Sequence, residues 1–150
     1  MIVVRCPTPG DTEALGTRLA SSLRPGDVVV LAGGLGSGKT LFTRGIATGL
    51  GVDEPVVSPS FVLVREYRTG FVPMIHVDVY RLGSMNEFDD LDALEMAEDG
   101  ILVIEWGEAV ESALPRDHLR IEFEVEDDQC RVLSFVGEGA WARRDLAGVA

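Results

Sequence analysis

Eight consecutive residues carry the clearest chemical signal in this chain. Residues 33–40 read Gly-Gly-Leu-Gly-Ser-Gly-Lys-Thr and match the phosphate-binding pattern G-x-x-x-x-G-K-[ST]. Glycines allow such a loop to aim backbone N–H groups at phosphate oxygens, because positive φ angles and close approach suit a residue without Cβ. The pattern predicts a nucleoside triphosphate site built from Gly33, Gly34, Leu35, Gly36, Ser37, Gly38, Lys39, Thr40 and Leu41.

Two side chains of this loop would act on the phosphates and on a metal ion. Lys39 is the sole lysine of the chain, and the other twelve basic residues are arginines. A slim ammonium fits a phosphate loop better than a planar guanidinium, so we expect Lys39 to contact the β- and γ-phosphates from a solvent-accessible position. The Thr40 hydroxyl is placed to ligate Mg²⁺. The predicted ligands are therefore ATP and Mg²⁺.

Two carboxylates are candidates for the metal and for the catalytic water. Strand alternation over residues 75–81 sends His76, Asp78 and Tyr80 to one face. Asp78 would hold the metal directly or through water, or would be a structural aspartate at a strand end, and we interpret His76 as a packing or hydrogen-bonding residue. Glu105 ends the apolar run 101–104, which places a carboxylate at the edge of the sheet, as in a Walker B strand.

The spacing of apolar residues indicates the elements that position these groups. A short β-branched strand at 27–32 leads into the glycines, and a helix at 41–50 follows them, with Gly51 at its end. We expect an α/β, single-domain P-loop NTPase-like fold, with a mixed sheet flanked by helices. Further predicted elements are a strand at 2–6, a helix capped by Asp11 or Thr12, strands at 62–67 and 75–81, one or two short helices within 84–100, a strand at 101–106, and a hairpin of 119–126 with 131–136.

Composition limits the remaining possibilities. A chain of 150 residues with 46% hydrophobic residues fits one domain, from which we expect only residues 137–150 to form a loose tail. The net charge of −12 disfavours autonomous tRNA binding. The sequence has neither a membrane-length apolar run nor a signal peptide, so we expect a cytoplasmic protein. Cys6 and Cys130 lack a metal-binding spacing, and we expect buried, reduced thiols.

Four motifs in order resemble the bacterial TsaE family over nearly the whole chain. They are Gly33-x4-Gly38-Lys39-Thr40, Ser58-Pro59-Ser60-Phe61, His76-x-Asp78-x-Tyr80-Arg81 and Glu105-Trp106. Ser60 keeps a hydroxyl where the family usually has threonine, and Gly107 stands where proline is common after Glu-Trp. On local evidence alone, the Ser-Pro-Ser segment is either a presented loop or an ordinary turn.

The resemblance implies an ATPase that acts with TsaB and TsaD in forming threonylcarbamoyladenosine (t6A) at position 37 of ANN-decoding tRNAs. It implies that Thr40 and Glu105 hold Mg²⁺ and that Asp78 lies near the metal and the attacking water. By the same match, residues 58–67 form a switch-like loop that includes Ser60. Thr12 and Arg131 are expected near the nucleotide.

Other nucleotide-binding functions are less consistent with the sequence. A P-loop small-molecule kinase is the main alternative, but it would normally need an arginine-bearing lid, and residues 84–100 are acidic instead. A GTPase that selects guanine through an N-K-x-D loop is excluded, because Lys39 is the only lysine. No register of residues 33–41 gives the G-x-G-x-x-G pattern of dinucleotide-binding proteins.

Overall fold

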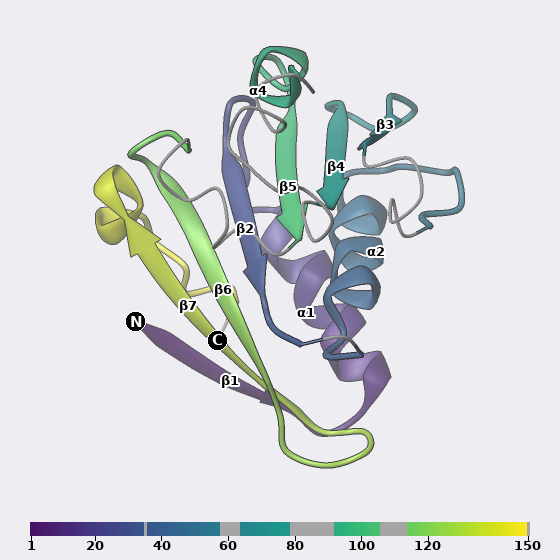
Figure 1. Ribbon diagram of the computed structural model, residues 1–150, viewed down its shortest axis with the longest axis vertical. Helices are drawn as coiled ribbons and strands as arrows, with labels where there is room; N and C mark the ends of the chain where they lie inside the picture. The colour runs from purple at the N-terminus through teal and green to yellow at the C-terminus, as the bar shows by residue number, and fades with distance from the viewer. Residues whose placement is uncertain (35, 58–63, 79–91, 106–113, 150) are drawn as a thin grey trace.

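One seven-stranded mixed sheet organises the molecule (Figure 1). The computed structural model describes residues 1–34, 36–57, 64–78, 92–105 and 114–149. The strand order is β1-β7-β6-β2-β5-β4-β3. The strands are β1 (Ile2–Cys6), β2 (Val28–Ala32), β3 (Val64–Tyr67), β4 (Met74–Asp78), β5 (Ile101–Glu105), β6 (His118–Val125) and β7 (Arg131–Glu138). The predicted α/β class with a mixed sheet is confirmed.

The four central strands are parallel, which decides where the candidate site lies. β6, β2, β5 and β4 run in the same direction. At the edges, β7 pairs antiparallel with β6, β1 pairs antiparallel with β7, and β3 pairs antiparallel with β4. Strands β2, β4 and β5 are buried along their whole length, which explains the continuous apolar runs of β2 and of residues 101–104 in β5. In open sheets of this kind, ligands bind beyond the carboxyl ends of the parallel strands. The phosphate loop, Asp78 and Glu105 all lie at that edge.

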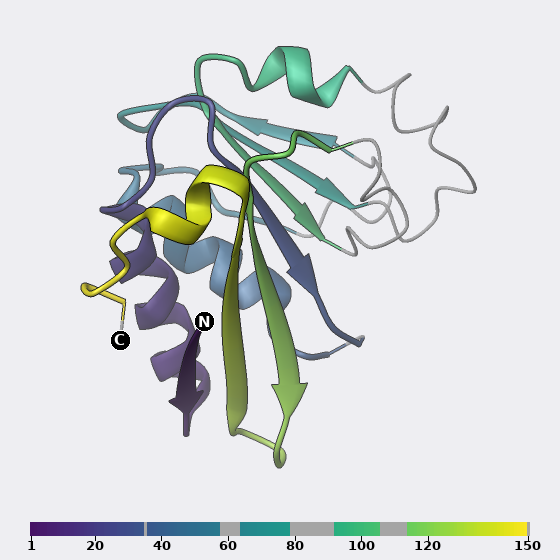
Figure 2. The ribbon, with the colours of Figure 1, turned by 90° about the vertical axis from the view of Figure 1, so that its left-hand side faces the viewer.

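Helices α1 (Pro9–Ala20) and α2 (Lys39–Gly49) pack closely together on one face of the sheet (Figure 2). Glycines allow this approach: a Cβ at Gly45 would collide with the carbonyl of Glu13, and one at Gly16 with the carbonyl of Phe42. The Thr17 hydroxyl donates to the Gly45 carbonyl at 3.0 Å. The main core forms beneath both helices, and Phe42 meets the rings of Phe123 and Phe135 edge to face there. This packing fixes the helix that begins at the phosphate loop.

A smaller apolar cluster covers the opposite face. It joins alternate residues of β4 and β5, such as Ile75 and Leu102, with Ala93 of the short helix α4 (Ala93–Met96). Leu94 and Met96 pack against it while partly exposed. Within the described residues, no helix is long and apolar enough to cross a membrane.

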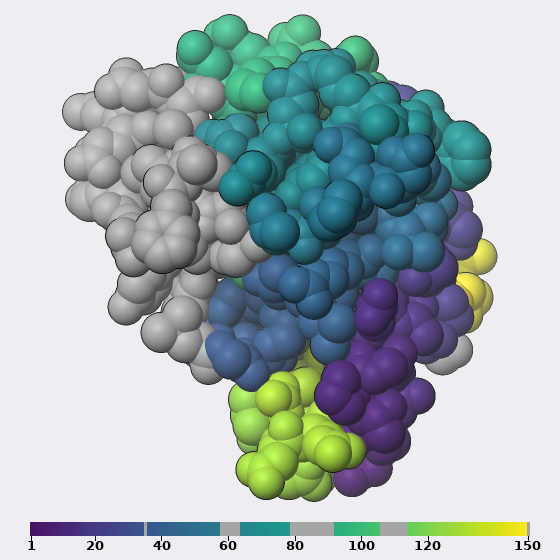
Figure 3. Space-filling view, turned by 90° about the vertical axis from the view of Figure 1, so that its right-hand side faces the viewer, coloured from purple at the N-terminus to yellow at the C-terminus, as the bar shows by residue number. Residues whose placement is uncertain are grey.

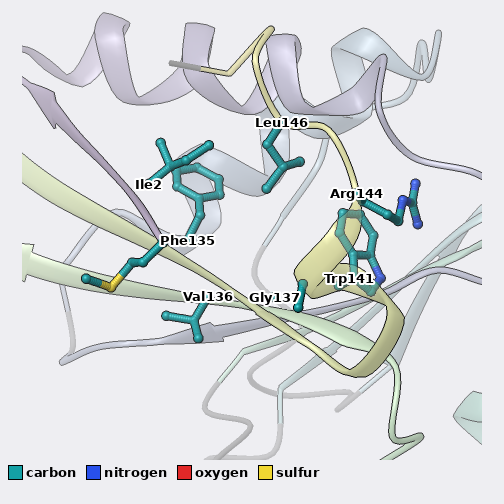
Figure 4. Close-up of a pocket in the computed structure, with 9 residues that line it drawn as sticks. Ile2, Phe135, Val136, Gly137, Trp141, Arg144 and Leu146 are labelled. Carbon is teal, nitrogen blue, oxygen red and sulfur yellow. The ribbon is translucent and has the colours of Figure 1, made fainter.

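The C-terminal segment is ordered, so the prediction of a loose tail from residue 137 was wrong. β7 continues to Glu138, and the 3₁₀ helix η2 (Gly139–Arg143) follows it. Trp141, Leu146 and Val149 are buried in the main core. Trp141 and Leu146 line a hollow of about 190 Å³, and the Arg144 guanidinium lies 3.6 Å from the centre of the Trp141 ring. Figure 4 shows how these three side chains lie. Trp141, Leu146 and Val149 follow no helical or strand spacing, because each packs into the core as a separate contact. The sequence pattern therefore did not predict their burial.

The first helix also begins earlier than predicted. Thr8, rather than Asp11 or Thr12, is the N-cap, and its side chain exchanges hydrogen bonds with Asp11 in a capping box. Pro9 occupies the first helical position, where its missing N–H has no partner to lose. Pro9 and Gly10 therefore form the start of α1. This start brings the buried Thr12 into the helix.

Both cysteines are free and buried, as predicted. Burial raises the pKa of the Cys6 thiol. The Cys130 thiol donates to the Glu126 carboxylate at 2.9 Å, and this hydrogen bond raises the pKa of Cys130. Both thiols therefore stay protonated at neutral pH, which is the unreactive form.

Candidate nucleotide site

The phosphate loop depends on two glycines for its backbone conformation. Gly36 has φ of 75° and Gly38 has φ of 101°, both in the left-handed region that side chains avoid. A Cβ at Gly36 would meet nothing within 4 Å, so conformation rather than space requires glycine there. Gly38 is also the N-cap of α2. The loop therefore ends at a helix N-terminus, which favours anions.

Lys39 lies inside the loop rather than in solvent. Its side chain is only 5% exposed, so the expectation of a solvent-accessible position was wrong. Nζ donates to the carbonyls of Gly33 at 2.7 Å and Gly34 at 2.9 Å, and Ser37 Oγ lies 3.5 Å away. The ammonium satisfies the backbone oxygens that the tight loop turns inward. The same contacts hold the charge at the centre of the loop, where a phosphate would lie.

Three side chains far apart in sequence form a hydrogen-bonded row beside the loop. The Thr40 hydroxyl donates to Glu105 Oε1 at 3.2 Å. Glu105 Oε2 lies 2.6 Å from His76 Nε2. Both Glu105 and His76 are buried. The sequence predicted Thr40 and Glu105 as partners on a metal, whereas the structure adds His76 to the same row.

The strand register places the second candidate carboxylate next to the first. Asp78 and Glu105 are paired positions at the ends of the parallel strands β4 and β5. Asp78 is 6% exposed, and it makes contacts of its own within the protein. Alternation along β4 puts Asp78 on the same face as His76, as predicted. Two buried carboxylates thus end adjacent strands at the edge of the sheet that carries the phosphate loop.

Arg131 and Thr12 reach the loop from other parts of the chain. The Arg131 guanidinium donates to the Ser37 carbonyl at 3.2 Å and to the Gly36 carbonyl at 3.1 Å. Thr12 Cγ2 lies 3.6 Å from the position that a Cβ on Gly38 would occupy. In the space-filling view, the turn between β6 and β7, the start of α1 and the phosphate-loop segment meet at one end of the molecule (Figure 3). Both residues were predicted near the nucleotide, and both lie against the loop that would bind it.

The turn that precedes Arg131 is fixed by an aspartate. The Asp127 carboxylate accepts hydrogen bonds from the backbone N–H groups of Gln129 at 2.9 Å and Cys130 at 2.8 Å. These bonds lower the pKa of Asp127, with the Cys130 N–H as the larger cause. Arg131 also donates to the Asp127 carbonyl at 2.7 Å. The guanidinium therefore connects a rigid turn to the phosphate loop.

Several predicted site residues lie outside the described part of the chain. These are Leu35, the Ser58–Phe61 motif with Ser60, the pair Tyr80 and Arg81, and the residues after Glu105, Trp106 and Gly107. The chain just before the Ser-Pro-Ser segment is held from two sides. Arg44 Nε donates to the Val56 carbonyl at 3.1 Å, and the Val57 N–H donates to the Tyr67 hydroxyl at 3.2 Å. The base of that segment is therefore tied to α2 and to β3.

The described donors suit a magnesium nucleotide. A hydroxyl and carboxylates are hard oxygen ligands, which Mg²⁺ prefers, and Mg²⁺ commonly takes one or two carboxylates together with substrate phosphates. Among the described residues, no group of three or more His, Cys, Asp or Glu side chains could hold a metal by itself. The inward ammonium of Lys39 and the left-handed glycines fit a phosphate chain. The residues thus fit Mg²⁺ and a triphosphate bound together.

Comparisons with known proteins agree with these observations. Residues 6–133 match the family model described as threonylcarbamoyl adenosine biosynthesis protein TsaE. The chain is 43% identical over 144 residues to the tRNA threonylcarbamoyladenosine biosynthesis protein TsaE of Streptomyces coelicolor, covering 91% of this chain and 97% of the relative. It is 38% identical over 135 residues to the protein of that name from Bacillus subtilis, covering 90% and 85%.

A solved structure shows the same architecture. The crystal structure of Bacillus subtilis YdiB superimposes with a TM-score of 0.76 at 34% sequence identity, covering 92% of this chain and 86% of that one. The family model covers both the phosphate loop and the strands that end at Asp78 and Glu105. The chain therefore belongs to the TsaE family of tRNA threonylcarbamoyladenosine biosynthesis proteins.

Proposed function

We propose that this chain is a Mg²⁺-dependent P-loop ATPase that supports t6A formation together with TsaB and TsaD homologues. Membership of the TsaE family supports the link to tRNA modification. The contact of the Thr40 hydroxyl with the buried Glu105 carboxylate carries the ATPase proposal. It joins the last residue of the phosphate loop to a Walker B-type strand end, which is where P-loop enzymes hold the metal that bridges the β- and γ-phosphates.

Each group of the site has a role in this proposal. Lys39 and the loop amides bind the phosphates, whereas Thr40 and Glu105 hold Mg²⁺. Asp78, beside Glu105, orients the attacking water or a water on the metal. When bound, Mg²⁺ neutralises charge on the phosphate oxygens. The protein contributes a buried, fixed set of dipoles and charges, which is the largest source of rate in reactions of this kind.

The arginines around the site support slow turnover by the isolated chain. An arginine that stabilises the transferred phosphoryl group increases the rate by about 10³- to 10⁵-fold. Arg131 is bonded to loop carbonyls, and Arg44 is bonded to the Val56 carbonyl. Each would have to leave these partners to act on the γ-phosphoryl group. We therefore propose that a partner protein completes or releases turnover.

The negative charge of the chain supports binding of the tRNA by other subunits. A net charge of −12 repels a phosphate backbone. In this proposal, the chain supplies ATP hydrolysis, and its partners hold the tRNA and carry out the modification.

The proposal is tested by measuring ATP hydrolysis and t6A formation in the same reconstituted system. The chain alone should hydrolyse ATP slowly, and TsaB and TsaD homologues should change its turnover. Synthesis of t6A over several turnovers should require the chain. Multiple-turnover synthesis that proceeds equally well without it would contradict the role in t6A formation. Transfer of the γ-phosphate to a metabolite by the isolated chain would favour the kinase instead.

A further inference from the structure

His76 is a buried polar residue for which the proposed reaction gives no role. Its side chain has 0% exposure, and it lies within β4, two residues before Asp78. Its paired position on β5 is Val103, not Glu105. The imidazole therefore extends along the sheet toward the carboxyl end of β5, where Nε2 lies 2.6 Å from Glu105 Oε2.

This contact leaves neither oxygen of Glu105 without a partner. Oε1 accepts from the Thr40 hydroxyl, and Oε2 faces His76 Nε2. An ionised carboxylate only accepts hydrogen bonds, so Nε2 carries the proton of this bond when Glu105 is ionised. A carboxylate held at both oxygens cannot rotate without losing one of these bonds. Its orientation relative to Thr40 is thereby fixed.

We propose that His76 is a positioning residue that orients Glu105 for Mg²⁺. The inference rests on the proposed function, because it assumes that Glu105 and Thr40 receive the metal of a magnesium nucleotide. The histidine acts through Glu105, since the ring is fully buried and its Nε2 contacts that carboxylate. Partners of this kind commonly alter metal affinity or activity by about 10- to 100-fold when they are removed.

Packing alone does not account for a histidine at this position. Other residues of β4, such as Met74 and Ile75, fill buried positions with apolar side chains. Burying an imidazole is unfavourable unless it is hydrogen-bonded, and Nδ1 has no hydrogen-bond partner among the described residues. The bond to Glu105 is thus the interaction that offsets the burial of this ring. An apolar residue would fill the volume but would leave one carboxylate oxygen unheld.

Two amide substitutions separate positioning from packing. In His76→Gln, the side-chain nitrogen lies the same number of bonds from Cα as Nε2, so it can still donate to Glu105. In His76→Asn, the nitrogen lies one bond nearer to the backbone and falls short. Both variants place a neutral amide in the same buried site, and thermal melting measures the effect of the one methylene by which their volumes differ. His118→Leu is the matched control, because His118 is also buried on a strand and its Nδ1 contacts the Pro115 carbonyl at 2.9 Å.

The experiment measures Mn²⁺ affinity of the protein–ATP complex by electron paramagnetic resonance, beside ATP affinity in EDTA and thermal melting. We expect His76→Asn and His76→Leu to weaken Mn²⁺ binding by about tenfold or more, with metal-free ATP affinity unchanged. His76→Gln and His118→Leu should stay near the parent value. If His76→Leu fails to fold, the Mn²⁺ affinities of His76→Gln and His76→Asn test the proposal without it.

The possible failures are distinguishable. Equal Mn²⁺ affinity in His76→Gln and His76→Asn would overturn the positioning role while leaving the ATPase proposal intact. Weakening of ATP affinity in EDTA to the same extent as Mn²⁺ affinity would also overturn it, because the effect would then not pass through the metal. If the parent protein bound no ATP with or without metal, both proposals would be overturned.

Discussion

Glu105 Oε1 accepts a hydrogen bond from the Thr40 hydroxyl at 3.2 Å, across 65 positions of sequence. Thr40 is fixed by the start of α2, and Glu105 by the end of β5. The contact exists because β2, which leads into the loop, pairs in parallel with β5 and places Leu31 opposite Glu105. Sheet register therefore assembles the metal-binding half of the proposed site.

The first prediction concerns Glu105. We expect Glu105→Gln to reduce ATP hydrolysis by about 10²-fold, the scale seen when one electrostatic group is removed from a preorganised site. Metal-free ATP affinity should not change, because it depends on Lys39 and the loop amides. Glu122→Gln is the control, since Glu122 lies on β6 with its side chain 55% exposed. Hydrolysis rates and calorimetry in EDTA check this, and equal rates for the two variants would refute the role of Glu105.

The second prediction concerns Lys39. Because Lys39 is buried, Lys39→Met is a better test than alanine, since it keeps an unbranched aliphatic side chain of similar length and removes the ammonium with its charge and hydrogen bonds. We expect ATP affinity to fall by at least about tenfold, since a hydrogen bond to a charged group contributes about 1.5–3 kcal/mol. Lys39→Arg should also lose affinity, because the planar guanidinium does not fit between the Gly33 and Gly34 carbonyls. Calorimetry beside circular dichroism measures both; parental affinity in Lys39→Met would exclude the phosphate-loop assignment.

The third prediction concerns Arg131, whose guanidinium donates to carbonyls of the phosphate loop. Arg131→Met removes the bonds to Gly36 and Ser37 and should weaken ATP binding several-fold. Arg5→Met on the neighbouring strand is the matched control: its pairing with Glu126 is solvent-exposed, and pairs of this kind contribute little. ATP affinities of the two variants should therefore differ. Equal ATP affinities in the two variants would mean that the hydrogen bonds of Arg131 to the loop do not affect nucleotide binding.

The fourth prediction tests the C-terminal packing. Trp141→Ala should lower the free energy of unfolding by about 3–5 kcal/mol, because it removes a buried aromatic ring from the main core. Phe71→Ala removes a ring that is 85% exposed and should change stability by less than about 0.5 kcal/mol. Urea unfolding of both variants measures the difference. A similar small effect for both would mean that residues 137–149 contribute little to the fold.

The sequence predicted the parts of this site that rest on local rules. The glycine pattern, the apolar strand before it and the helix after it indicated the phosphate loop, and the carboxylate after residues 101–104 indicated a Walker B-type strand. The burial of Lys39 could not be predicted, because it depends on carbonyls that turn inward only in the folded loop.

The prediction that His76 is a packing or hydrogen-bonding residue is confirmed, but its partner Glu105 could not be predicted for a related reason. Strand alternation placed it on the face of Asp78, but its contact with Glu105 depends on the pairing of β4 with β5. Strand register is a tertiary property, and no spacing within one strand reveals it. The C-terminal error has the same origin, since Trp141 packs against distant elements without any periodic pattern.

The central claim is that residues 33–40, together with Glu105, bind a magnesium nucleotide. The most direct test is a crystal structure with a non-hydrolysable ATP analogue and Mn²⁺, in which the anomalous signal locates the manganese ion. The account predicts the triphosphate within the loop of residues 33–40, with Lys39 redirected from the Gly33 carbonyl toward the phosphates. Mn²⁺ should bind the Thr40 hydroxyl and phosphate oxygens, with Glu105 contacting it directly or through one water. A triphosphate bound away from this loop, or a manganese peak that contacts neither Thr40 nor a water held by Glu105, would contradict it.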